Sequence, residues 1–464
     1  MRRLKHDVII VGCGPAGIFT ALELSFTGGL DVVMLDKGYE VERRRCPANR
    51  GLGCVKCNPC NLLCGWGGSG AFSDGKLTLS PEVGGWLSEY VGEAELSSLI
   101  EYVDQIYVKF GAPEKLYGTD VDRINELKRR AALAGLKLVP VKVRHLGTER
   151  CVEVTGAMRR ALGGKVEVRM GVEAEEILVE DGRVKGVKLR GGEVLEGKYV
   201  VVAPGRGGAD WLRREAQRLG LGLINNPVDV GVRVEVPAHV TEHLVEVLYE
   251  PKLIYYSKSF DDKVRTFCFN PNGEVITEYY DGVVTVNGQS YVNKRTDNSN
   301  FAILVSTTFT EPFKEPIAYG KYIASLANLL GGGVIVQRLG DLKSGRRSTW
   351  ERIKRNLVEP TLKAATPGDL SFVLPYRYLS DILEMLKALD EVAPGIYSNH
   401  TLLYGVEVKF YSSRLELNDR LETKVRNLFA IGDGAGITRG LVQASASGVV
   451  VAREILRREG LLRS

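Results

Sequence analysis

The sequence of 464 residues has no run of 18 or more apolar residues, so it predicts no transmembrane helix. It also has no long basic block. Its 62 Lys and Arg are interspersed with 57 Asp and Glu for a net charge of +5, which gives nucleic-acid binding little support. A secretory signal is not expected, because Asp7, the glycines that follow and the absence of a small-residue cleavage site argue against one. The expected compartment is therefore the cytoplasm.

The bulk composition is that of an ordinary globular protein, with 44% hydrophobic and 26% charged residues. A chain of this length is long for a single core and suggests two or three domains. Four of the eight cysteines lie within residues 54–64. In a cytoplasmic protein, that clustering favours metal or redox chemistry over structural disulfides.

The amino terminus predicts a dinucleotide site. Residues 7–12 form an apolar run typical of a buried parallel strand, and a helical pattern follows. Between them lies a G-x-G-x-x-G turn, whose glycines permit a tight turn, close backbone approach to a pyrophosphate, and close helix packing. A second strand ends at an acid suited to the ribose hydroxyls. The predicted binding residues are Gly12, Gly14, Pro15, Ala16, Gly17, Asp36 and Lys37. The alternative is a structural strand–helix turn without a ligand.

The carboxyl-terminal stretch, residues 428–448, again runs from an apolar strand into a glycine-rich turn and a helix. It resembles the second flavin motif of the glutathione-reductase-like FAD proteins, with Asp433 between Gly432 and Gly434. In that family the aspartate binds the ribityl chain. The turn at Ala203 and Gly205 partly resembles the A-T-G turn of the same proteins, and the strands before it match their β-meander. No second G-x-G-x-x-G follows a strand, so we expect no dedicated NAD(P) domain.

Further blocks extend the resemblance over most of the chain. The whole sequence resembles a family of uncharacterised FAD-dependent dehydrogenases related to the glutathione-reductase-like flavoproteins. The resemblance implies bound FAD and redox chemistry, without a substrate. Thr438-Arg439 departs from the family pattern. The blocks that carry the resemblance are GCGPAG, CGWGGSGAFSDGKLTLS, RHLGTE, VDVGVRVEV, VRTFCFNPNGEV, VTVNGQSY and GDGAG.

The resemblance implies an α/β fold: a Rossmann-like FAD-binding domain, with a parallel sheet and a β-meander, and an inserted mixed α+β cap or substrate domain. The expected FAD domain is discontinuous and contains residues 1–225 and 405–464. Within it we expect a helical insertion near 81–135, from its apolar spacing, and a Cys-rich loop over 46–64. Residues 226–404 form the expected cap.

The cysteine run has the spacing C-x2-C-x2-C-x3-C, whose first intervals match the bacterial ferredoxin pattern that binds a [4Fe–4S] cluster. Cys54, Cys57 and Cys60 begin the site, and Cys64 or Cys46 completes it. Three alternatives stay open. The thiolates bind zinc, Cys60 and Cys64 form a redox-active pair, or the four thiols are packed.

Residues 67–76 resemble the loop that folds back over the pyrophosphate and flavin in related flavoproteins. Its glycines allow close backbone approach, and Gly68 and Ser69 are expected to contact the cofactor. Lys76 is a candidate catalytic residue, beside Cys60 and Cys64; the alternative for Lys76 is a solvated loop lysine. His145 is expected to be structural. Arginines of the expected cap, Arg233, Arg265, Arg346, Arg347 and Arg377, are candidates for binding a substrate anion.

These features predict an FAD-dependent oxidoreductase, a dehydrogenase or reductase of a small organic substrate, with an anionic substrate as one possibility. A [4Fe–4S] cluster and a one-electron carrier are possible additions. The alternatives are a flavin-dependent disulfide reductase that uses Cys60 and Cys64, and a non-catalytic electron-transfer flavoprotein.

Overall fold

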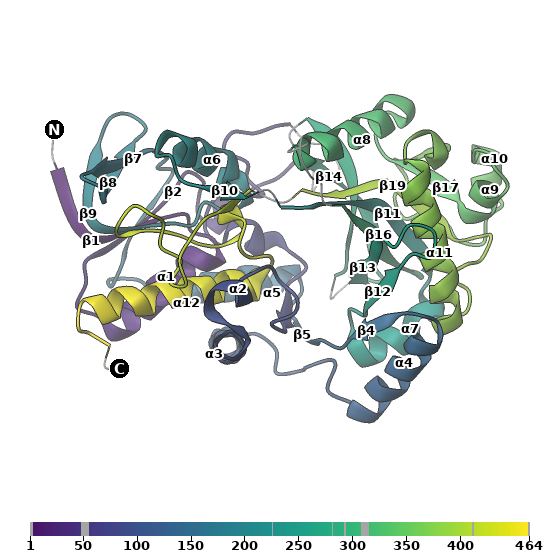
Figure 1. Cartoon of the computed structure of the whole chain (residues 1–464), viewed down its shortest axis with the longest axis horizontal. Coiled ribbons are helices and arrows are strands. Elements are labelled where there is room, and N and C mark those ends of the chain that lie inside the picture. The colour runs from purple at the N-terminus through teal and green to yellow at the C-terminus, as the bar shows by residue number, and fades with distance from the viewer. Residues whose placement is uncertain are drawn as a thin grey trace. The chain divides into compact units, whose positions relative to one another are not determined.

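The structure, a computed structural model, describes residues 3–47, 55–224, 226–280, 282–291, 294–307, 315–410 and 413–462. The chain divides into two compact units, each with its own hydrophobic core (Figure 1). The first unit contains Met1–Lys115, Arg144–Asn225 and Ser412–Ser464. The second contains Leu116–Val143 and Asn226–Tyr411.

The sheet of the first unit is parallel along most of its width. Its parallel strands run in the order β6 (Glu167–Met170), β2 (Val32–Asp36), β1 (Arg3–Val11), β9 (Val194–Val202) and β21 (Leu428–Ala430). Parallel strands end at the same edge, so the turns after β1, β2, β9 and β21 gather there. Continuous burial from Val32 to Leu35 reflects a sheet covered on both faces. The Rossmann-like α/β fold predicted from the sequence is confirmed.

The β-meander is also present. Strands β7 (Ala174–Glu180), β8 (Arg183–Leu189) and β9 pair in antiparallel order. Asp181 and Gly182, at φ of 50° and 69°, form the left-handed turn between the first two, which suits the Asp-Gly pair.

Two helices pack against each other on this sheet. Helix α1 (Pro15–Thr27) begins with proline at its first turn, where the missing N–H costs nothing, and helix α12 (Leu441–Arg458) lies beside it (Figure 1). The contact is close because Gly448 has no side chain. A Cβ atom there would lie 2.2 Å from the carbonyl oxygen of Ala16. The other helices and short strands of this unit are α2 (Ser88–Val91), α3 (Glu93–Lys109), α5 (Thr148–Ala161), α6 (Ala209–Arg218), β3 (Lys76–Leu79), β10 (Leu223–Ile224) and β20 (Arg414–Leu415).

The second unit is built on a mixed sheet. Its order is β18 (Thr366–Pro367), β17 (Ile335–Arg338), β19 (Leu402–Lys409), β11 (Val228–Pro237), β16 (Asn298–Thr307), β13 (Lys263–Asn270), β12 (Lys252–Tyr256) and β4 (Lys137–Val139). Only the β17–β18 pair is parallel among these described strands. A hairpin, β14 (Glu274–Tyr280) and β15 (Val283–Gln289), accompanies the sheet. Its helices are α4 (Val121–Leu133), α7 (Ala238–Leu248), α8 (Pro316–Gly331), α9 (Leu339–Lys343), α10 (Trp350–Lys354) and α11 (Tyr376–Val392).

The unit boundaries differ from the predicted domain boundaries. Residues 116–143 belong to the second unit because β4 pairs with β12, and residues 405–411 belong there because β19 pairs with β11. The expected helical insertion over 81–135 is therefore split: α2 and α3 lie in the first unit and α4 in the second. Strand β5 (Lys142–His145) spans the boundary.

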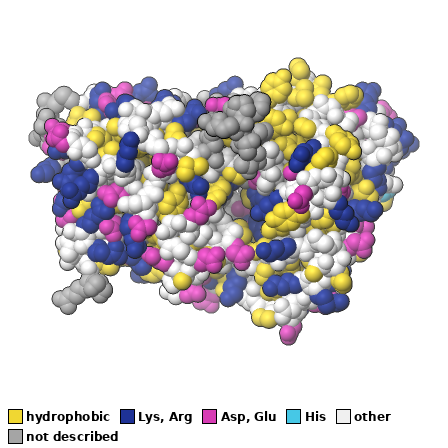
Figure 2. Space-filling view, viewed as in Figure 1, with side chains coloured by type: hydrophobic (Ala, Val, Ile, Leu, Met, Phe, Trp, Pro, Cys, Tyr) yellow, Lys and Arg dark blue, Asp and Glu magenta, His cyan; other side chains and the backbone are white. Residues whose placement is uncertain are grey.

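Among the described residues, no helix is both long and apolar enough to cross a membrane. Acidic and basic side chains are mixed over the face shown in Figure 2, as the near-balanced composition predicts.

The α1–α12 contact gives the first prediction. Gly448→Ala places a methyl group against backbone that has no freedom to move aside, so we expect a loss of about 1–3 kcal/mol or more in the free energy of unfolding. The measurement is urea denaturation followed by circular dichroism. Gly156→Ala in α5 is the matched control, because a Cβ there meets only the end of the Arg160 side chain, at 3.6 Å. The control is expected to be neutral or stabilising, since alanine favours helix. Equal stability of the two variants would contradict the close contact.

Candidate functional site

The glycine-rich turn after β1 contains glycines with different physical roles. Gly12 has a φ of 113°, and a Cβ on it would lie 2.0 Å from the carbonyl oxygen of Ala203. A Cβ on Gly17 would lie 2.0 Å from the carbonyl oxygen of Gly12. Both glycines are therefore required by protein packing. Gly14 differs, because its φ is −79° and a Cβ there would meet only the Cα of Gly68, at 3.9 Å. The space in front of Gly14 is thus open to a ligand.

Asp36, at the end of β2, joins three backbone segments. Its Oδ2 accepts a hydrogen bond from the Cys13 N–H at 2.9 Å. Its Oδ1 accepts hydrogen bonds from the N–H groups of Gly38 and Gly65, both at 2.8 Å. A carboxylate oxygen has room for about two donors, so Oδ2 retains capacity for a hydroxyl group. The predicted ribose acid therefore also has a structural role that the sequence did not reveal.

The loop that follows the cysteine run lies against the glycine-rich turn. The Gly67 N–H donates to the Cys13 carbonyl at 2.8 Å, and a Cβ on Gly68 would lie 3.0 Å from the Cα of Gly14. The loop continues as the short 3-10 helix η3 (Gly68–Phe72), in which the Ser69 side chain is half-buried. The loop thus lies against the dinucleotide turn, and its expected position over the pyrophosphate and flavin stays a prediction. Contact of Gly68 and Ser69 with a cofactor remains a prediction.

Arg44 holds this loop in place, and sequence reasoning missed it. Its buried guanidinium donates to four carbonyl groups, those of Asn61, Leu62, Trp66 and Gly68, at 2.6–2.9 Å. Burial lowers the pKa of Arg44 to about 10. An isolated arginine in sequence carries no signal for such a role, because its acceptors are main-chain atoms that come near only in the fold.

The turns after β9 and β21 complete the edge. A Cβ on Gly434 would lie 2.5 Å from the Gly205 carbonyl oxygen, and one on Gly432 would lie 3.0 Å from the Cβ of Ala16. Asp433 accepts a hydrogen bond from the Thr438 hydroxyl at 2.9 Å. Burial raises the pKa of Asp433, while Arg206 and Thr438 oppose the rise. Thr438, which departs from the family pattern, thus supports the predicted cofactor acid.

Lys37, which the sequence also predicts to bind the cofactor, contacts the turn after β9. Its Nζ donates to the carbonyl of Gly207 at 3.2 Å, in the turn that follows Gly205. It therefore ties the end of β2 to the end of β9. The sequence predicted Lys37 as a cofactor-binding residue and did not predict this hydrogen bond to Gly207.

The residues at this edge fit the dinucleotide portion of FAD. The open space at Gly14 suits a pyrophosphate, and helix α1 begins beside it with unpaired N–H groups. Asp36 and Asp433 provide acceptors for hydroxyl groups at the ends of β2 and β21. Beside Pro15 and Gly70 lies an apolar cavity of about 10 Å³, enough for about one water molecule. That cavity is too small for a substrate.

Lys76 is not a solvated loop lysine. Its side chain is only 7% exposed, and its Nζ forms an ion pair with Asp74 at 2.8 Å. His145 lies in the same charged group, and burial and the Lys76 charge lower its pKa to about 4. Burial alone raises the pKa of Asp74, but Lys76 and His145 more than offset this and hold it below its ordinary value. His145 is therefore neutral at pH 7.

The cysteine run does not form a metal site in the part of the chain that the structure describes. No three His, Cys, Asp or Glu side chains there are placed to bind one ion, and Cys46, Cys57, Cys60 and Cys64 are free thiols. Cys54 lies outside the described residues. Burial raises the pKa of Cys64 to about 11, which disfavours its thiolate. Within residues 55–64 and at Cys46, the structure therefore gives the [4Fe–4S] hypothesis no support, and the hypothesis stays a prediction.

Arginines of the second unit that the sequence proposes for a substrate anion have separate partners. Arg233 is fully buried and forms a bidentate ion pair with Glu407, at 2.7 and 2.8 Å. Arg265 pairs with Asp229 at 2.5 Å, and Arg377 pairs with Asp262. Arg346 and Arg347 lie apart from these, between α9 and α10. Four of these five arginines thus pair with four different carboxylates, Arg346 with Asp341.

The pKa of His145 gives a prediction on stability. Its pKa is about 4 in the folded chain against 6.5 for an ordinary histidine. Between pH 6.5 and about pH 4 the unfolded chain binds a proton at this histidine and the folded chain does not. The free energy of unfolding therefore falls as pH falls. From pH 7 to pH 5 this contribution is on the order of 2 kcal/mol.

The measurement is denaturant unfolding of wild type, His145→Gln and His239→Gln at pH 7 and pH 5. His239 is exposed, so its variant should keep the wild-type pH dependence. His145→Gln should lose stability less steeply between the two values. An unchanged slope in that variant would show that His145 is not held neutral.

The chain is similar to several known proteins. An uncharacterized protein of Clostridium beijerinckii (strain ATCC 51743 / NCIMB 8052) is 28% identical, over 98% of this chain and 81% of that protein. L-proline dehydrogenase from P. horikoshii aligns over 99% of this chain and 95% of its own, at 12% identity and a TM-score of 0.40. Glycine oxidase from Geobacillus kaustophilus aligns over 98% and 95%, at 14% identity and a TM-score of 0.39. At these TM-scores, the two likenesses carry no argument about this chain.

A family match covers most of the second unit. Residues 227–410 match the family described as FAD-dependent protein, C-terminal domain-like.

Proposed function

We propose that this protein is an FAD-dependent oxidoreductase, a dehydrogenase or reductase of a small organic substrate. The observation that carries the proposal is the open space at Gly14 within an edge where Gly12, Gly17 and Gly434 are all packed against backbone. Packing against backbone requires Gly12, Gly17 and Gly434 to be glycine, but it does not require this of Gly14. A glycine at such a position indicates that a ligand approaches the backbone there. The match of residues 227–410 to an FAD-dependent protein family supports the same cofactor.

In this proposal the first unit holds FAD. Backbone N–H groups at the start of α1 face the pyrophosphate, and Asp36 accepts from the adenosine ribose. Asp433, positioned by Thr438, accepts from the ribityl chain. FAD supplies the transfer of a hydride or two electrons to or from the substrate. The chain itself orients the cofactor and fixes the loop over it through Arg44.

Lys76 is the proposed catalytic residue of this chain. Its Nζ forms an ion pair with Asp74, and the neutral His145 beside it adds no competing charge. A cation fixed next to the loop over the dinucleotide turn is suited to orient an anionic substrate or to stabilise negative charge on a reduced flavin.

The alternative of a disulfide reductase receives less support. Cys60 and Cys64 are four residues apart on one turn, where the Cys64 N–H donates to the Cys60 carbonyl at 2.9 Å. However, a reactive thiol needs a lowered pKa, and the pKa of Cys64 is raised to about 11. A non-catalytic electron-transfer flavoprotein is the remaining alternative, and reduction of bound FAD by a small organic compound would exclude it.

The test of the flavin site is Gly14→Val. Its Cβ meets only the Gly68 Cα, at 3.9 Å, so we expect the first unit still to fold while the side chain fills the pyrophosphate space. We expect at least a tenfold loss of bound FAD with a melting temperature near that of wild-type apoprotein. The measurement is flavin absorbance per protein with thermal unfolding followed by circular dichroism.

Gly12→Ala is the matched control. It clashes with the Ala203 carbonyl and requires a φ of 113°, so it should lower stability as well as FAD content. A yellow Gly14→Val protein with full FAD content would overturn the assignment of this turn.

The cysteine run gives a separate prediction. The described residues give a cluster no support, and the proposed function contains no electron path through one. Protein purified without oxygen should hold one FAD and far less than one iron, and Cys57→Ser should leave both values unchanged. The measurement is iron and acid-labile sulfide per flavin. About four irons per flavin, lost in Cys57→Ser, would restore the [4Fe–4S] hypothesis and a one-electron partner.

A further inference from the structure

One stretch of the second unit carries a high local charge. Residues 338–356 contain seven Lys or Arg and two Asp or Glu, so this stretch alone carries a net charge of +5. The whole chain of 464 residues also has a net charge of +5. The basic residues are separated in sequence by small and apolar ones, which is why no long basic block is visible there. Two short helices, α9 and α10, bring them together.

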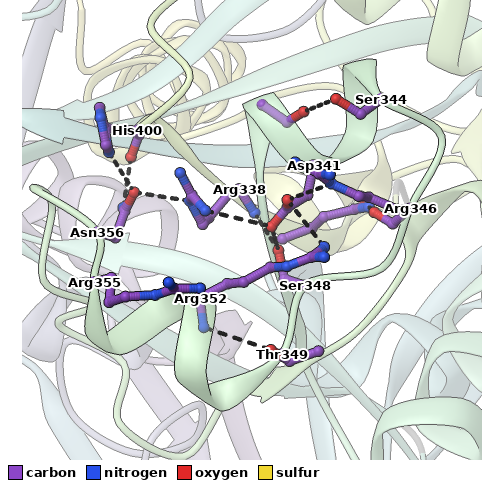
Figure 3. Close-up of polar contacts among 12 residues, drawn as sticks. Arg338, Asp341, Ser344, Arg346, Ser348, Thr349, Arg352, Arg355, Asn356 and His400 are labelled. Atoms are coloured by element: carbon purple, nitrogen blue, oxygen red, sulfur yellow. Dashed lines mark hydrogen bonds and ion pairs between the residues drawn. The ribbon is translucent and has the colours of Figure 1, made fainter.

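Asp341 orders the arginines of this stretch (Figure 3). Its carboxylate is only 1% exposed. Its Oδ1 accepts from Arg346 Nε at 3.1 Å and from Arg352 Nη1 at 3.3 Å. Its Oδ2 accepts from the Ser348 hydroxyl at 2.8 Å and lies 3.8 Å from Arg338 Nη1. Three guanidinium groups therefore converge on one carboxylate.

The charges of this group do not balance. One carboxylate offsets one of the three guanidinium charges, and two positive charges remain. Arg346 is 56% exposed and Arg352 is 30% exposed, so their charges face solvent. The same stretch of chain contains four further exposed basic side chains, Lys343, Arg347, Lys354 and Arg355, and one exposed acid, Glu351.

Hydrogen-bond donors also remain. The recorded contacts of Arg346 use Nε, and those of Arg352 use Nη1. A guanidinium has five N–H groups, so the terminal nitrogens of Arg346 and further donors of Arg352 are available to a ligand. Because Asp341 already fixes their orientation, these side chains lose little conformational entropy when they bind.

We propose that the arginines ordered by Asp341 form a binding site for the phosphate groups of a ligand. Phosphate fits because it accepts bidentate hydrogen bonds from guanidinium groups and brings the negative charge that this group lacks. Trp350, 52% exposed at the start of α10, lies one residue after Thr349, which caps that helix. The phosphate belongs to a soluble phosphorylated compound or to a lipid headgroup. This inference does not depend on the flavin, so its test can fail while the proposed function stands.

The experiment uses the FAD-loaded protein, so that the dinucleotide turn is occupied. One arm titrates inorganic pyrophosphate and ADP at low ionic strength by calorimetry. The other arm measures co-sedimentation with phosphatidylcholine vesicles, with and without about one third phosphatidylglycerol. Binding in the first arm identifies a soluble phosphate ligand, and binding only to anionic vesicles identifies a headgroup.

The variants separate binding from folding. Arg346→Gln should weaken binding at least tenfold and reduce its salt dependence, with an unchanged melting temperature because the side chain is half-exposed. Arg346→Lys should recover part of the affinity, because it restores charge without the fork. Lys128→Gln on α4, also exposed, is the control and should bind as wild type does. Absence of binding to every probe, or equal binding by Arg346→Gln and Lys128→Gln, would overturn the proposal.

Discussion

The carboxylate of Asp36 is the constraint on which the candidate flavin site depends. It accepts hydrogen bonds from the N–H groups of Cys13, Gly38 and Gly65, and so joins the glycine-rich turn, the end of β2 and the loop after the cysteine run. Without an acceptor at this point, three buried donors would each lose a partner, at about 1–3 kcal/mol apiece. Arg44 completes the arrangement from the other side. It satisfies four carbonyl groups of the same loop that Asp36 holds through an N–H group.

This arrangement also determines the state of the nearby thiols. Cys13 and Cys64 lie in an environment that is both buried and next to the Asp36 charge, and both factors raise their pKa values. A thiol under these conditions behaves as a small apolar side chain rather than as a nucleophile. Burial and the Asp36 charge therefore work against thiolate chemistry at Cys64, and they outweigh the opposing charges of Lys37 and Arg44.

The sequence predicts the parts of the fold that depend on local patterns. The parallel strands, the glycine-rich turns and the meander with its Asp181-Gly182 turn all follow from residue order and spacing. It does not predict interactions between distant segments. Pairing of β4 with β12 moves residues 116–143 to the second unit, and the burial of Lys76 beside His145 depends on segments about 70 residues apart. The role of Arg44 is invisible for the same reason, because main-chain carbonyls carry no sequence signal.

Arginine in this protein shows how the balance of partners separates structural from binding roles. Arg44 is buried, and each of its recorded donors has a carbonyl acceptor. Arg233 is fully buried and shares a bidentate pair with Glu407, with asparagine and backbone oxygens as its other acceptors. Such arginines stabilise the fold and have few N–H groups left for a ligand.

The three arginines around Asp341 are different, because they share a single carboxylate and stay partly exposed. The net charge of the whole chain hides this contrast. It is +5 over 464 residues, which is ordinary, and the nineteen residues 338–356 have the same net charge of +5. What decides the function of a basic residue here is the number of acceptors that the fold supplies to it, and only around Asp341, among the arginines compared, does the fold supply too few.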